Sequence, residues 1–122
     1  MGIFNWPLTV DVTLEMDIAK DMEVFGPVLP IIGFDTWEEA IEITNSSKYG
    51  LMGGVMTKDI NTAMKIATSM ECGGVVINGA GRYRTADSPF GGYKMSGLGR
   101  EGAGTSLEEM SQIKAIVLKG VR

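Results

Sequence analysis

The chain has 122 residues, a formal net charge of −4 and Lys and Arg residues dispersed singly, so we expect one domain that binds neither nucleic acid nor an anionic membrane. Its apolar runs are far shorter than the roughly 20 residues that span a bilayer, and its first residues lack a secretory signal pattern, which predicts a cytoplasmic protein. Because the sequence has no histidine and a single cysteine, it excludes within this chain a Ser-His-Asp triad, a histidine-containing zinc site and an internal disulfide.

The first regular pattern is a strand followed by a helix. An apolar run at residues 28–34 predicts the strand. Residues 36–47 follow with apolar side chains at helical spacing. Thr36 and Glu39 fit a capping box, which predicts that the helix begins there.

A second strand and helix come next. Residues 53–57 predict the strand, and the helix is expected to begin after Asp59 and to end near Met70, before a pair of glycines. Residues 74–78 predict a third strand. The order β-α-β-α-β favours an α/β fold with a parallel sheet and helical crossovers, with residues 1–122 in a single domain.

The pattern becomes irregular and glycine-rich between Gly79 and Gly99, and long loops of this kind commonly carry function. A short helix is expected at residues 105–110. The last apolar stretch, residues 112–119, predicts a C-terminal strand with no later strand in the chain to pair with. Because an unpaired strand edge tends to pair with another chain, we predict that this strand serves oligomerisation.

Two local motifs have an ordinary structural interpretation that we favour. Gly97, Gly99 and Gly102 form a G-x-G-x-x-G pattern, but no apolar strand precedes it and no acidic residue lies about 20 positions later, so it fits a turn before a helix better than a dinucleotide site. Cys72 lies between a helix end and two glycines, where a packed thiol is a simpler interpretation than a nucleophile.

Two pairs of residues are candidates for ligand binding. Glu23 and Phe25 stand one residue apart where an apolar run begins, so on a strand they would point the same way from its rim. Arg82 and Arg84 flank Tyr83 in the long loop, where two guanidinium groups could hold a carboxylate or phosphonate of a substrate. A solvated loop with scattered charge is the alternative for the arginines, and the sequence leaves both open.

A family resemblance covers nearly the whole chain. The stretches EVFGPVLPIIGFDTWEEAIEITNSSKYGLMGGVMTKDINTAMKIA, GGVVIN and SPFGGYKMSGLGREG resemble, in order and spacing, the C-terminal portion of the NAD(P)-dependent aldehyde dehydrogenases. The resemblance implies that Glu23 binds the nicotinamide ribose hydroxyls of NAD or NADP and that Phe25 packs beside the nicotinamide ring. It also implies that Phe90 lines the aldehyde tunnel and that Arg82 and Arg84 lie at its mouth.

The same resemblance implies that essential groups lie outside this chain. The family's cysteine nucleophile, glutamate base, oxyanion-binding asparagine and adenosine-binding domain all precede the matched portion, and Cys72 does not take the place of the nucleophile. The expected protein is a C-terminal fragment of an enzyme that oxidises an aldehyde to a carboxylic acid through a cysteine thiohemiacetal, inactive by itself.

The resemblance also bears on assembly. In the family the C-terminal strand extends a sheet of the neighbouring subunit, which implies that Lys114 to Lys119 join this chain into a homo-oligomer. The alternative is a non-catalytic α/β interaction module that self-associates or binds a dehydrogenase partner.

Overall fold

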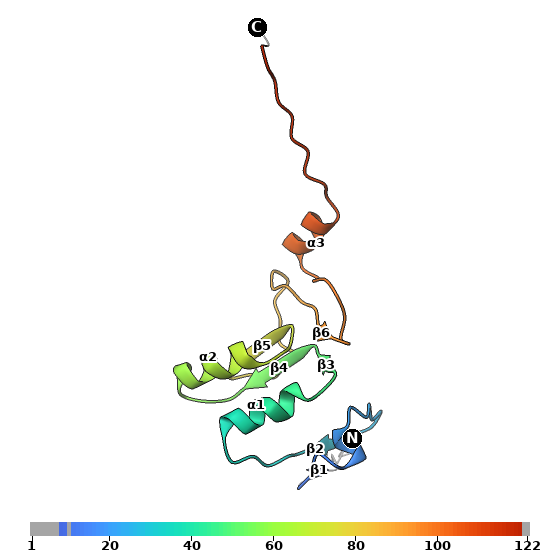
Figure 1. Ribbon diagram of the computed structural model, residues 1–122, viewed down its shortest axis with the longest axis vertical. Helices are drawn as coiled ribbons and strands as arrows, with labels where there is room; N and C mark the ends of the chain where they lie inside the picture. Colours follow the sequence, from blue (N-terminus) through green and yellow to red (C-terminus); the bar gives the residue numbers. More distant parts are fainter. Residues whose placement is uncertain (1–7, 10, 121–122) are drawn as a thin grey trace, which may run out of the picture.

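The computed structural model describes residues 8, 9 and 11–120, so the two ends of the predicted domain lie outside the described residues. An α/β body is followed by a long segment that extends away from it toward the C-terminus (Figure 1). In chain order the elements are β1 Leu8–Thr9, the 3-10 helix η1 Asp17–Ala19, β2 Leu29–Pro30, α1 Trp37–Asn45, β3 Tyr49–Gly50, β4 Met52–Val55, α2 Ile60–Ser69, β5 Gly74–Ile77, β6 Tyr93–Lys94 and α3 Ala103–Glu109.

The centre of the body is the unit β4-α2-β5. Strands β4 and β5 pair in parallel, with Met52 opposite Gly74 and Val55 opposite Ile77. Helix α2 crosses between them and packs on both, and α1 packs beside α2. Ala63 of α2 is 1% exposed, which makes this helix face the best-buried point of the structure.

Both main helices begin where the sequence predicts. The Thr36 hydroxyl accepts the backbone N–H of Glu39 at 3.2 Å, and the Glu39 carboxylate accepts the N–H of Asp35 at 2.8 Å, so the reciprocal bond reaches one residue further back than in a standard capping box. At α2, Asp59 accepts two backbone N–H groups of the first turn. The Thr62 hydroxyl and these N–H groups lower the pKa of the Asp59 carboxyl.

The predicted three-stranded parallel sheet is wrong. Strand β2 pairs in parallel with β1, and among the described residues the sheets are three separate two-stranded ones: β1-β2, β3-β6 and β4-β5. The strand expected at residues 28–34 is reduced to Leu29–Pro30. Pro30 has no N–H to donate to a ladder, which confines such a segment to a short edge pairing.

The C-terminal strand expected at residues 112–119 does not form within the single chain. Beyond α3 the backbone is extended through residue 120 and pairs with no strand of the described residues. The side chains of Ile113, Ile116, Val117 and Leu118 are at least 78% exposed. A lone strand cannot satisfy its own backbone groups, so this segment becomes a strand only when another strand lies beside it.

The chain exposes far more surface than a compact protein of its mass. Its accessible surface is 10136 Å², whereas a folded monomer of this mass exposes about 6,400 Å². Among the described residues the buried apolar side chains are only those of Val12, Val55 and Ala63. The apolar surfaces of this body therefore lack the cover that a complete core would provide.

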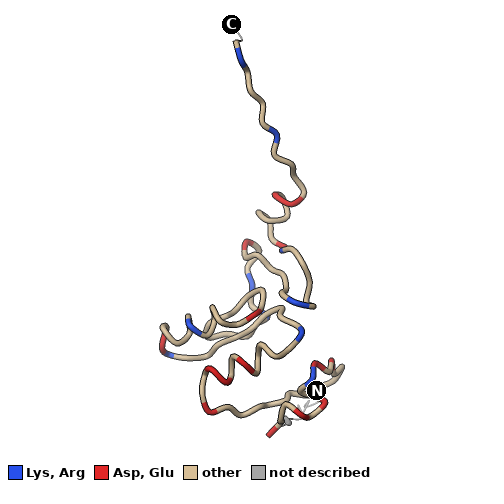
Figure 2. The backbone as a smooth tube through the Cα atoms, in the orientation of Figure 1, with Lys and Arg blue, Asp and Glu red and all other residues tan. Residues whose placement is uncertain are grey.

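Charge is spread over this open body rather than gathered. Acidic residues follow one another along α1, and basic residues are scattered singly along the chain (Figure 2). In the part of the chain that the structure describes, no helix is long and apolar enough to cross a bilayer.

Candidate functional site

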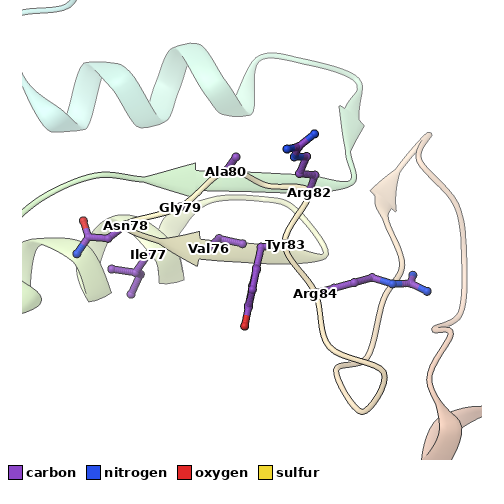
Figure 3. Close-up of a pocket in the computed structure, with 8 residues that line it drawn as sticks. All are labelled: Val76, Ile77, Asn78, Gly79, Ala80, Arg82, Tyr83 and Arg84. Carbon is purple, nitrogen blue, oxygen red and sulfur yellow. The ribbon is translucent and has the colours of Figure 1, made fainter.

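The loop that follows β5 lines an open cavity at the end of that strand. The cavity has a volume of about 680 Å³ and is lined by Val76, Ile77, Asn78, Gly79, Ala80, Arg82, Tyr83 and Arg84 (Figure 3). Ligand sites of parallel sheets commonly form beside the carboxyl ends of the strands. This region, predicted to be functional from its glycine-rich sequence, is the candidate site.

Asn78 fixes the start of this loop, a role that sequence reasoning missed. Its backbone is in the left-handed region with φ of 56°, which asparagine tolerates better than most residues. Its N–H donates to the carbonyl of Val55 at 2.6 Å, and its side-chain oxygen accepts the N–H of Thr57 at 3.0 Å. Asn78 therefore joins the end of β5 to the end of β4 and directs the chain over the cavity. A polar amide directly after an apolar strand was the available signal.

Arg84 is engaged by other residues of the chain. Its guanidinium lies over the Phe90 ring, 4.4 Å from the ring centroid, and its Nη1 lies 3.3 Å from Oε2 of Glu101. Phe90 and Glu101 also exchange two backbone hydrogen bonds, of 2.7 and 2.6 Å. Arg84 therefore holds the Phe90 ring from one side, although an ion pair this exposed contributes only about 0 to 1 kcal/mol by itself.

Arg82 and Arg84 do not converge on one point. In Figure 3 the Arg82 side chain extends to one side of the loop, Arg84 extends toward another segment, and Tyr83 points away from Arg82. No hydrogen bond or ion pair within the described chain involves the guanidinium of Arg82. Within the described residues Arg82 therefore keeps all its donors available for a ligand, whereas Arg84 uses one of its five on Glu101.

Phe90 borders a second, smaller cavity on the same loop. Its ring is half-buried, and it shares a cavity of about 310 Å³ with Tyr83 and Arg84, among other residues. An aromatic wall beside a cavity can hold an apolar or flat group by contact. The structure thus brings Phe90 and Arg84 together, whereas Arg82 shares only the first cavity with Arg84.

Glu23 and Phe25 lie elsewhere, in the segment between η1 and β2 (Figure 1). The strand rim predicted for them is wrong, because β2 begins only at Leu29 and two tight turns precede it, with Gly26 N–H bonded to Val24 and Val28 N–H bonded to Gly26. Both side chains are exposed, and the Phe25 ring is 94% exposed. An exposed carboxylate beside an exposed aromatic ring is typical of a surface that contacts a ligand or another segment.

The two remaining motifs have structural roles. Gly97, Gly99 and Gly102 all have positive φ, at 127°, 74° and 151°, and they turn the chain into the short helix α3, as the turn interpretation predicted. The Cys72 thiol is half-buried and donates to the carbonyl of Gly74 at 3.2 Å. Within the described residues no group of His, Cys, Asp or Glu side chains is arranged to hold a metal ion.

Comparison with known proteins decides the family. Residues 1–116 match the sequence profile described as the aldehyde dehydrogenase family. This chain belongs to the aldehyde dehydrogenase family. The resemblance of its motifs is thereby confirmed.

Its relatives are considerably longer proteins. The lactaldehyde dehydrogenase of Methanococcus maripaludis strain C5 is 52% identical over 107 residues, which cover 88% of this chain and 23% of the relative. The crystal structure of the glyceraldehyde-3-phosphate dehydrogenase GapN from Methanocaldococcus jannaschii, complexed with NADP, has a TM-score of 0.81 at 46% identity, over 92% of this chain and 24% of that one. Aldehyde dehydrogenase 21 from Physcomitrella patens, in complex with the reaction product succinate, has a TM-score of 0.83 at 36% identity, over 93% and 24%. This aldehyde dehydrogenase chain thus spans about a quarter of the length of the relatives it matches.

Proposed function

We propose that this chain is the C-terminal part of the catalytic domain of an aldehyde dehydrogenase that oxidises an aldehyde to a carboxylic acid with NAD or NADP. The family match along residues 1–116 carries the proposal. The reaction proceeds through a thiohemiacetal on a cysteine outside this chain. Cys72, whose thiol donates a hydrogen bond to the carbonyl of Gly74, is not this nucleophile. A cytoplasmic location without nucleic-acid or membrane partners remains the prediction from composition.

In this proposal Glu23 and Phe25 contact the nicotinamide half of the cofactor. A carboxylate can accept two ribose hydroxyls at once, and the Glu23 side chain is exposed for this. The 94% exposed Phe25 ring would gain stabilisation from covering a flat nicotinamide. NAD or NADP supplies the acceptor for the hydride. These residues fit the nicotinamide half, and solved relatives are complexes with NADP and with NAD.

Around the aldehyde, Phe90 and the two arginines have different tasks. Phe90 forms the wall of the aldehyde tunnel, and Arg84 holds its ring in place. Arg82, whose donors are not used within the described chain, is the residue that reads a distal anion on the substrate. Both arginines thus border the tunnel mouth, but only one binds the anion directly.

The C-terminal segment serves assembly in this proposal. Residues Lys114 to Lys119 are extended, and their side chains are exposed. Pairing with a strand of a second subunit would satisfy their backbone groups and cover the apolar side chains. The product is a homo-oligomer.

A second candidate function is favoured by the open surface of the chain. An accessible area of 10136 Å² suits a non-catalytic α/β interaction module that self-associates or binds a dehydrogenase partner. The two candidate functions differ in their expected result: as part of a complete enzyme, the catalytic fragment supports aldehyde oxidation and the interaction module does not.

A graft tests the enzyme proposal and Glu23 together. This chain replaces the matching quarter of the Methanocaldococcus jannaschii relative, and the product is called the graft below. The 122-residue chain alone should form no NAD(P)H from short aldehydes, whereas the graft should. Glu23→Gln in the graft should slow hydride transfer at low cofactor concentration about tenfold to a hundredfold, because a charge-assisted hydrogen bond is weakened.

The matched control is Glu38→Gln, which changes an exposed carboxylate on α1 and should leave the kinetics unchanged. A well-folded but inactive graft would favour the interaction module. Equal kinetics of the Glu23→Gln graft and its parent would refute the assignment of Glu23.

A second prediction separates the two arginines. In the graft, Arg82→Ala should reduce activity on an aldehyde with a distal carboxylate or phosphonate about tenfold or more, with little effect on a neutral aldehyde of the same length. Arg84→Ala should reduce both activities alike, because the substitution removes the contact that holds the Phe90 ring and not a contact to the substrate's anion. Steady-state kinetics on the paired substrates measures this, and equal losses with Arg82→Ala would support the solvated-loop interpretation.

A third prediction concerns the C-terminal segment. The purified chain should form dimers or larger species in light scattering, and Ile116→Pro should shift it toward monomer because proline removes a ladder donor. Ile116→Val keeps the donor and the shape and should change nothing. A monomer at high micromolar concentration, insensitive to both substitutions, would contradict the role of this segment.

A further inference from the structure

Residues 45–50 form the stretch where α1 ends and β3 begins, which we call the α1–β3 junction. Three other segments, around Asp21, Glu71 and Lys94, contact it. The carboxylate of Asp21 accepts the Ser47 hydroxyl and, at 3.0 Å, the N–H of Lys48. The ammonium of Lys94 donates to the carbonyls of Asn45 and Ser47, at 2.7 and 3.0 Å. Asp21 and Lys94, 73 positions apart in the sequence (94 − 21), thus bind the same short stretch.

Lys94 suits its place at the end of a helix. The last carbonyls of an α-helix have no partner inside the helix, and a cation there also interacts favourably with the helix dipole. The ammonium has three donors, and they meet the Asn45 carbonyl, the Ser47 carbonyl and the carboxylate of Glu71 at 2.7 Å. With its side chain 25% exposed, Lys94 is the least exposed cation among the ion pairs of the described residues.

Asp21, like Lys94, is an anchor, by which we mean a residue whose contacts hold its own segment against the α1–β3 junction. Its backbone is left-handed, with φ of 56°, a conformation that costs energy outside glycine and persists where the surroundings hold it. The Ser47 hydroxyl, then the Lys48 N–H, lower the pKa of its carboxyl, with smaller contributions from the nearby ammonium groups of Lys48 and Lys94. The group is therefore ionised, and able to accept both bonds, at neutral pH.

Each anchor stands next to one half of the proposed site. Asp21 lies two residues before Glu23, and Lys94 lies four residues after Phe90. Further bonds join the junction to the segment after Lys94: Met95 N–H donates to the Lys48 carbonyl, at 3.0 Å. Glu23 and Phe25 are exposed, so their placement depends on the backbone on either side of them.

We propose that Asp21 and Lys94 are positioning residues that hold the Glu23 segment and the Phe90 segment at a fixed separation through the α1–β3 junction. The functional consequence rests on the proposed function: this separation sets the distance between the nicotinamide and the aldehyde. Neither residue touches substrate or cofactor. Each acts through the residue that it positions.

A structural test needs no enzymatic activity. In the 122-residue chain labelled with 15N-lysine and 15N-phenylalanine, the Lys48 amide signal should titrate below the ordinary pKa of an aspartate, and Asp21→Asn should abolish this titration. Lys94→Met should shift the Phe25 amide signal, and the exposed-lysine control Lys58→Met should not. The proposal is overturned if the Lys48 amide still titrates in Asp21→Asn, or if the Phe25 amide signal does not shift in Lys94→Met.

A kinetic test uses the graft, whose activity without further substitutions decides the proposed function separately. Asp21→Ala should raise the Michaelis constant for the cofactor about three- to tenfold, and it should add little in a Glu23→Gln background, because both act through the same contact. Lys94→Met should raise the Michaelis constants for cofactor and aldehyde together. Fully additive effects of Asp21→Ala and Glu23→Gln would show a merely structural role and overturn the proposal.

Discussion

The long loop is placed by contacts in which backbone meets backbone without side chains between. A Cβ added at Gly73, directly before β5, would overlap the carbonyl of Gly91, and one added at Gly54 in β4 would lie 2.7 Å from the carbonyl oxygen of Gly79. These glycines let the two ends of the loop settle directly on the β4-β5 pair. The position of the Phe90 ring, its contact with Arg84 and the cavity at the end of β5 all depend on this close approach.

What the sequence predicted correctly was local. The starts of α1 and α2 follow from Thr36 and Asp59, whose capping bonds reach only two or three residues along the chain. The crossover from β4 through α2 to β5 follows from short apolar strands around a periodic helix. Such features need no information about distant residues.

The features that the sequence did not predict are pairings between very few residues that lie far apart in the chain. Strands β3 and β6 are two residues each and meet across more than 40 positions, and the Phe90–Glu101 bridge is a single pair. No periodicity exists in so short an element. The same reason explains the site: the partner that engages Arg84 lies 17 residues later, so the arginines looked equivalent in sequence although their contacts differ.

The openness of the body connects the fold with the proposed function. The β4-β5 pair has one helix-packed face and few buried side chains, and two-stranded sheets are marginally stable without further cover. In relatives about four times as long, the same quarter is accompanied by the rest of the enzyme. In the proposed function, the rest of the enzyme covers this open body, and the exposed Phe25 ring belongs to the surface that contacts the cofactor.

Amide hydrogen exchange at Val55 and Val76 tests this dependence most directly, in the isolated chain and in the graft. The account predicts that these two amides, in the middle of the body, exchange at least about a hundredfold faster in the isolated chain, because opening of an uncovered sheet costs less free energy. Equally slow exchange in both would contradict the account, since it would show that the β4-β5 unit is stable without any further cover.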